Sequence, residues 1–189
     1  MDYSIKNYLQ DVINHYISIW GDDFQEKKWS KGPIMETVPH FSVLEYKPHS
    51  SNGMWTYATC GMSTYTHISP IEIHLFSKVQ DESIVELLTT VCYYHNVDAN
   101  VNLGHTINFG RPWQDLSPSS YGLFSLPYLD GPNLEIMNSA DHKEVHFYWL
   151  IPITEAEVEY KKEHGLEALE CKFETDEFNY LNPKRRSVV

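Results

Sequence analysis

Residues 144–151 constrain the fold of this chain more than any other segment. They read Glu-Val-His-Phe-Tyr-Trp-Leu-Ile, a largely apolar run rich in β-branched and aromatic side chains. Such side chains pack well on a pleated surface, and a near-continuous apolar run is typical of a strand buried on both faces. We therefore expect residues 145–151 to form an internal strand of a sheet that is covered on both sides.

Several shorter segments predict partner strands. Residues 41–46 and 54–60 are joined by a turn-rich link that favours a hairpin. Residues 71–76 alternate between apolar and polar side chains over most of their length, which indicates one buried face and one face in water. Further short strands are expected at residues 101–109, 121–126 and 134–137. Together these segments predict a mainly antiparallel or mixed sheet of at least five strands.

Helices are expected at each end of the chain and in the middle. Between Ser4 and Trp20 the apolar residues recur at i, i+3, i+4 and i+7, so we expect an amphipathic helix that packs on the sheet. A second helix is expected over residues 82–95. The third begins at a capping box formed by Thr154 and Glu157, and ends between residues 165 and 169.

These elements predict an α+β fold, because strands joined by turns alternate with three separate helices. We expect one domain that spans residues 1–183. The last residues, 184–189, begin with Lys184-Arg185-Arg186, and we interpret them as a frayed basic tail.

The composition narrows the class of protein. Hydrophobic residues make up 42% of the chain, which is enough for a packed core. No apolar run approaches the roughly 20 residues that cross a bilayer, and the first residues lack the features of a signal peptide. The three cysteines, Cys60, Cys92 and Cys171, are widely spaced and do not suggest disulfides. We therefore expect a cytoplasmic protein with no membrane partner.

Charge is the strongest compositional signal. The chain carries a net charge of −12, which disfavours direct binding to a phosphate backbone. Nine acidic residues and three lysines lie between Glu155 and Glu177, so half of the net charge falls in this short segment. Two interpretations remain open, a solvated helix surface or a docking surface for a basic protein.

The docking interpretation predicts specific contact residues. The candidate partner-binding residues are Glu159, Glu163, Glu167, Glu170 and Glu174. We expect Glu157 and Lys161 to form an ordinary i, i+4 pair. A competing surface is the 109–132 region, where aromatic residues lie among Pro, Gly and Ser residues typical of an exposed loop. Its candidate aromatic anchors are Phe109, Trp113, Tyr121 and Tyr128.

No motif indicates catalysis. The ten histidines show no zinc-binding spacing, and the sequence contains no HExxH, GxSxG, P-loop or GxGxxG. We expect no metal, no cofactor and no enzymatic activity. Cys60 and Ser63 are the candidate nucleophiles, and either of them in an open pocket, hydrogen-bonded to a histidine, would contradict this expectation.

Several segments together resemble the suppressor-of-fused family. Thr59-Cys60-Gly61-Met62-Ser63 is followed by the strand at residues 71–75, and Leu103-Gly104-His105-Thr106 is similar to a family segment after the middle helix. Leu126-Pro127, the run 150–157 and residues 161–165 are similar to the C-terminal half of the family domain. The resemblance spans roughly residues 30 to 170. The motif residues that it treats as turn and scaffold positions are Gly61, Met62, Ser63, Gly104, Pro127 and Pro152.

The resemblance implies a mixed α/β domain that binds protein and is not known for catalysis. Bacterial single-domain members are similar to immunity proteins that neutralise secreted toxins, often nucleases. A length of 189 residues fits this bacterial form. The resemblance therefore predicts an antitoxin that binds a basic toxin domain. The alternatives are a peptide- or protein-binding regulator without a toxin partner and, least favoured, a metal-dependent hydrolase.

Overall fold

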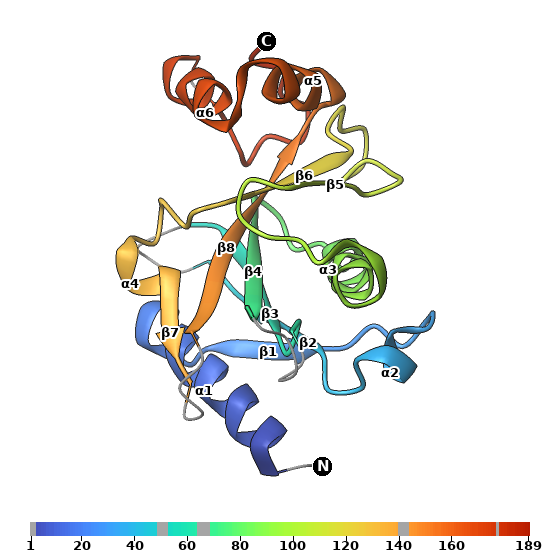
Figure 1. Ribbon diagram of the computed structural model, residues 1–189, viewed down its shortest axis with the longest axis vertical. Coiled ribbons are helices and arrows are strands. Elements are labelled where there is room, and N and C mark those ends of the chain that lie inside the picture. Colours follow the sequence, from blue (N-terminus) through green and yellow to red (C-terminus); the bar gives the residue numbers. More distant parts are fainter. Residues whose placement is uncertain (1–2, 49–52, 64–68, 140–143, 177) are drawn as a thin grey trace.

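The computed structural model describes residues 3–48, 53–63, 69–139, 144–176 and 178–189. Their strands form one mixed sheet in the order β1-β2-β3-β4-β8-β6-β5, and β7 also pairs with β8 (Figure 1). The strands are β1 Phe24–Lys27, β2 Ser42–Tyr46, β3 Trp55–Cys60, β4 Ile71–Ser77, β5 Thr106–Asn108, β6 Tyr121–Ser125, β7 Ile136–Asn138 and β8 Glu144–Ile153.

The predicted central strand is confirmed. β8 lies between β4, to which it is parallel, and β6, to which it is antiparallel. Its residues from Phe147 to Ile153 are all buried, since side chains on both faces of the strand enter the core. The α+β class and the mixed sheet are confirmed with it.

The helices cover both faces of the sheet. They are α1 Tyr3–Trp20, α2 Ile34–Thr37, α3 Ser83–Tyr94, the π-helical turn η1 His95–Ala99, α4 Pro132–Glu135, α5 Glu155–His164 and α6 Leu166–Thr175. α3 packs on the face that includes Tyr148 and Leu150. α1 packs near Phe147, while α5 and α6 pack near Trp149 and Ile151. Since alternate residues of a strand share a face, α1 and the α5–α6 pair cover the same face at opposite ends of the molecule (Figure 1).

The alternating pattern at residues 71–76 predicted a wet face, and this prediction is wrong. Every residue of β4 is buried, including Glu72 and His74. Both polar side chains find polar neighbours beneath the covering elements: Glu72 accepts a hydrogen bond from α1, and His74 Nε2 lies 3.2 Å from Oδ2 of Asp130. Alternation here reflects polar groups that are buried beneath covering elements, not a solvated surface.

Other boundaries differ from the prediction at turns. The strand expected at residues 101–109 is reduced to β5, because residues 103–104 form a turn in which Gly104 has φ +74°. Residues 134–135, expected as strand, belong to the helical turn α4, and β1 lies where no strand was expected. Gly165, with φ +91°, separates α5 from α6, which continues to Thr175.

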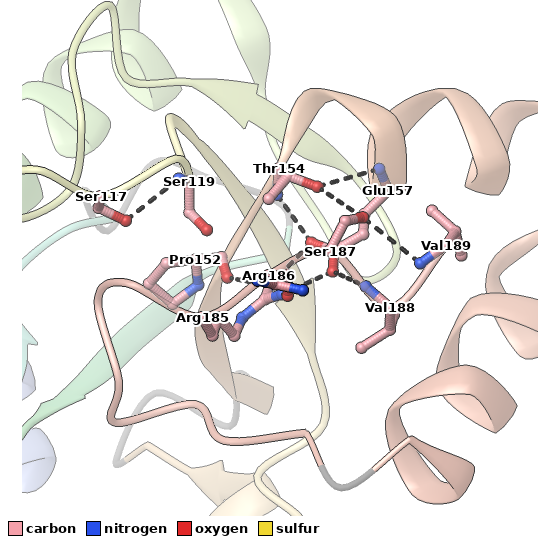
Figure 2. Close-up of polar contacts among 10 residues, drawn as sticks. All are labelled: Ser117, Ser119, Pro152, Thr154, Glu157, Arg185, Arg186, Ser187, Val188 and Val189. Atoms are coloured by element: carbon pink, nitrogen blue, oxygen red, sulfur yellow. Dashed lines mark hydrogen bonds and ion pairs between the residues drawn. The ribbon is translucent and has the colours of Figure 1, made fainter.

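The C-terminal residues are not frayed, which corrects the predicted boundary at residue 183. Arg185 is buried and forms an ion pair with Glu157 of α5, so the last residues are fixed to the domain (Figure 2). In the described part of the chain, no helix is both long and apolar enough to cross a membrane.

Candidate functional site

The acidic residues predicted from sequence lie on two short helices at one end of the molecule (Figure 1). Val158 and Leu169 anchor α5 and α6 to the sheet, and Leu166 and Phe173 pack beside them. We call the remaining exposed carboxylates on these helices the acidic face. It comprises Glu155, Glu159, Glu163, Glu167 and Glu174. Glu177 lies outside the described residues.

The members of the acidic face have few partners of their own. The side chain of Glu163 is 74% exposed. That of Glu159 is 59% exposed and forms an ion pair with Lys162 at 2.7 Å, a contact between two exposed groups of the kind that contributes little to stability. Packing therefore demands neither carboxylate, and both are available to a partner.

Glu170, the fifth predicted contact residue, is in a different environment. It is partly buried and accepts a hydrogen bond from Ser125 Oγ at 3.1 Å. Burial raises the pKa of the Glu170 carboxyl above its ordinary value, against the effect of its hydrogen bonds from Ser125 and Tyr128. Glu170 therefore belongs to the edge of the domain rather than to its solvated surface.

Glu170 lies between the two docking surfaces predicted from the sequence, the acidic segment after Glu155 and the 109–132 region. Tyr128 is 59% exposed and lies beside Glu170, and partial burial together with the neighbouring carboxylates raises the pKa of its phenol. We call this group the Tyr128 seam. It comprises Tyr128, Leu129, Glu135, Glu170 and Glu174. An exposed aromatic ring rimmed by carboxylates fits a basic protein surface, since aromatic residues dominate interface energies and the rim selects for charge.

The rest of the 109–132 region does not form an exposed aromatic loop, contrary to that alternative. Trp113 is only 2% exposed and belongs to the core next to α3. Phe109 packs over Gly122, where an added Cβ would lie 2.6 Å from the ring. Of the four proposed anchors, Tyr128 is the exposed one, while Tyr121 is partly buried. Turn residues surround Trp113 because the chain folds back there, not because the segment is solvated.

The family-like segment 59–63 surrounds a buried carboxylate. Glu72 Oε1 accepts hydrogen bonds from the backbone N–H groups of Gly61 and Met62, at 2.9 and 3.0 Å, and from the hydroxyl of Tyr8 at 3.0 Å. Thr59 Oγ1 donates to Oε2 at 2.6 Å. Burial raises the pKa of Glu72 to about 7, although these donors oppose the shift. This network joins α1 to the sheet, and sequence reasoning did not anticipate it.

One hydrogen bond named above as a sign of catalysis is present. Ser63 Oγ lies 3.1 Å from Nε2 of His95, and Ser63 borders a mostly apolar cavity of about 140 Å³. However, Ser63 is 1% exposed, and the same hydroxyl accepts from the N–H of Ile71 and donates to its carbonyl. Three partners use the full bonding capacity of a hydroxyl, which is typical of a structural serine.

Cys60 is also in an unreactive environment. Burial raises the pKa of its thiol well above the ordinary value, and the nearby Glu72 carboxylate adds to the effect. A thiol held in the protonated form is a poor nucleophile. Within the described ranges, no three His, Cys, Asp or Glu side chains are grouped closely enough to hold a metal ion.

Comparison with known proteins agrees with this architecture. The family model of the suppressor of fused protein (SUFU) matches residues 37–186. YqcF, an immunity protein of Bacillus subtilis (strain 168), is 21% identical over 156 residues, which cover 78% of this chain and 81% of YqcF.

Solved structures show the same fold. The crystal structure of a SUFU homologue from Neisseria gonorrhoeae superposes with a TM-score of 0.86 at 31% identity, over 97% of this chain and 98% of that one. The Sufu–Fu complex superposes with a TM-score of 0.71 at 12% identity, over 96% and 92%. Since the family model covers most of the sequence, including the 59–63 segment and the capping box, the chain belongs to the suppressor-of-fused family.

Proposed function

We propose that this chain is an immunity protein that acts in the cytoplasm and neutralises a cognate toxin by binding it directly. The observation that carries the proposal is the acidic face, whose carboxylates are exposed although packing requires none of them. YqcF, the relative of 21% identity, is named an immunity protein, and this supports the immunity role without specifying a toxin.

The charge of the acidic face favours a basic partner, and a nuclease domain is the toxin class that fits best. A nuclease presents a basic cleft to phosphates, and an acidic inhibitor can occupy such a cleft as a charge mimic. Long-range attraction also speeds association, which matters when a toxin must be captured before it acts. In this proposal the Tyr128 seam provides the apolar anchor and the acidic face provides the electrostatic attraction.

A second candidate is a protein-binding regulator without a toxin partner. The solved complex of Sufu with Fu favours it, because that complex shows the same fold bound to another protein. The two candidates differ in the identity of the partner, and only the first predicts a toxin encoded beside this chain.

Affinity capture from the native host tests the proposal with a matched pair of variants. The first variant reverses Glu159, Glu163, Glu167 and Glu174 to Lys. The control reverses Asp22, Asp23, Glu36 and Asp115, which are exposed in other parts of the molecule, so both variants have the same net charge. We expect a basic toxin domain to be captured by the wild type and by the control, and to be lost with the first variant. Capture of a non-toxic protein supports the regulator, and equal capture by all three chains moves the interface away from the acidic face.

A further inference from the structure

Arg185, near the C-terminus, occupies a site formed by α5 and β8. The guanidinium of Arg185 makes two parallel contacts with Glu157, Nη1 to Oε1 at 2.6 Å and Nη2 to Oε2 at 2.8 Å (Figure 2). Nη2 also donates to the carbonyl of Pro152 at 3.0 Å, and the guanidinium stacks over Phe178 at 4.5 Å. Side-chain exposure is 7% for Arg185 and 0% for Glu157.

Glu157 also holds residues on either side of this ion pair. Its Oε2 accepts from the backbone N–H of Thr154 at 2.7 Å, which completes the capping box of α5. Its Oε1 accepts from the backbone N–H of Val188 at 3.1 Å, and Thr154 Oγ1 donates to Ser187 Oγ at 3.1 Å (Figure 2). The first turn of α5 and the end of the chain are therefore one hydrogen-bonded unit, and the expected pair with Lys161 is replaced by a buried one.

Few side chains of α5 are buried. It has ten residues, fewer than the roughly 12–15 at which isolated helices become marginally stable in water. Only Glu157 and Val158 are buried in it, and one of these two is the carboxylate that binds Arg185. Val158 and the half-buried Tyr160 pack on the core, and the contacts with the C-terminal residues add to this limited packing.

We propose that residues 185–189 are a C-terminal latch that controls whether α5 is ordered. When Arg185 occupies its site, α5 is capped and Glu159 and Glu163 have fixed positions. When Arg185 leaves, the buried Glu157 loses its countercharge and α5 opens locally while the sheet remains folded. The consequence for partner binding rests on the proposed function, because Glu159 and Glu163 belong to the acidic face.

Hydrogen exchange of the full-length chain tests the latch without a partner. The variant is Arg185→Ala, and the matched control is Arg186→Ala, which removes an exposed arginine at the next position. Since breaking a buried ion pair is strongly destabilising, we expect exchange in residues 155–164 to become about 100-fold faster or more in Arg185→Ala. Protection of β4 should fall only by the loss in global stability, so β4 stays protected when α5 does not. Arg186→Ala should match the wild type throughout.

Two further measurements keep the proposal testable if Arg185→Ala folds poorly. Arg185→Lys keeps the charge but loses the planar fork, so it should show a smaller acceleration confined to α5. Methylguanidinium at millimolar concentration should restore protection to Arg185→Ala, whereas methylammonium should not. Unchanged exchange in α5, or loss of protection in α5 and β4 together, would overturn the latch.

The association rate of the captured partner with Arg185→Ala then distinguishes the latch from the proposed function. If α5 opens in Arg185→Ala and association slows, both stand. If α5 opens and association is unchanged, the latch stands and the partner binds elsewhere.

Discussion

Glu72 and Glu157 lie on the same side of the sheet and are both fully buried, but they are stabilised in different ways. Glu72, beneath α1, accepts hydrogen bonds from neutral donors, among them Tyr8, Thr59 and two backbone N–H groups. Glu157, at the start of α5, faces the guanidinium of Arg185. A buried carboxylate without a countercharge is costly to ionise, whereas a buried ion pair is costly to break. The first arrangement makes stability depend on pH, and the second makes it depend on one distant residue.

The largest expected effect comes from breaking the ion pair. We expect Arg185→Met to lower the free energy of unfolding by roughly 3–5 kcal/mol, because it leaves Glu157 buried without a countercharge. The double variant Glu157→Gln/Arg185→Met should be less destabilised than this single variant, since no unpaired charge remains. Denaturant titration of the wild type, both single variants and the double variant measures the coupling, and additive effects would contradict the comparison.

The next effect is the pH dependence that Glu72 imposes. Burial raises the pKa of Glu72 from 4.5 to about 7, so between these values the folded protein binds more protons than the unfolded chain. The contribution of this group to stability is therefore greatest below pH 4.5 and is lost as pH rises to about 7, by roughly 3 kcal/mol in total. Glu72→Gln should remove this part of the pH dependence. Denaturant titrations at pH 5 and pH 8 measure it, and an unchanged difference in the variant would contradict the assignment.

A smaller change sharpens the same site. Tyr8→Phe removes one donor to Glu72 and should cost about 1 kcal/mol at neutral pH, the usual net value of a buried hydrogen bond. Because that donor favours the ionised carboxylate, its loss should raise the pKa of Glu72 further and extend the pH dependence to higher pH. The titration of Glu72 followed by carboxyl carbon NMR checks this, with Tyr94→Phe, at an exposed tyrosine of α3, as the control.

The smallest effects are expected for the exposed carboxylates. Glu163→Lys should change the free energy of unfolding by no more than about 0.5 kcal/mol, since it removes no buried contact. Glu170→Lys should cost about 1 kcal/mol or more, because Glu170 is partly buried and accepts from Ser125. Thermal unfolding of the two variants distinguishes them, and equal melting temperatures would place Glu170 on the solvated surface after all.

The features that were predicted correctly depend on residues close together in the sequence. The run at residues 145–151, the periodicity of α1 and the capping box at Thr154 each depend on neighbours in the sequence, and the structure confirms them. The Arg185–Glu157 pair joins positions 28 residues apart, so a basic tail looked frayed. Glu72 and His74 looked solvated because alternation in one strand does not reveal that α1 and Asp130 cover it.

The candidate site was predictable in part for the same reason. The density of acidic residues after Glu155 is visible in the sequence, and the apolar residues Val158 and Leu169 that anchor the two helices are visible there too. The proximity of Tyr128 to Glu170 was not visible, because these residues lie on separate elements that only the sheet brings together. Pro, Gly and Ser around Trp113 suggested an exposed loop, although the indole itself fills the core.

The association rate of the captured partner tests the proposed interface most directly. It should be measured at low and at high salt for the wild type, the acidic-face variant and the control with the same net charge. We predict that association of the acidic-face variant at low salt is slower by a factor of about ten or more. The control should stay close to the wild type, and the difference between the two variants should shrink as salt rises. Equal slowing of both variants would mean that only net charge matters, and an unchanged rate in the folded acidic-face variant would place the interface elsewhere.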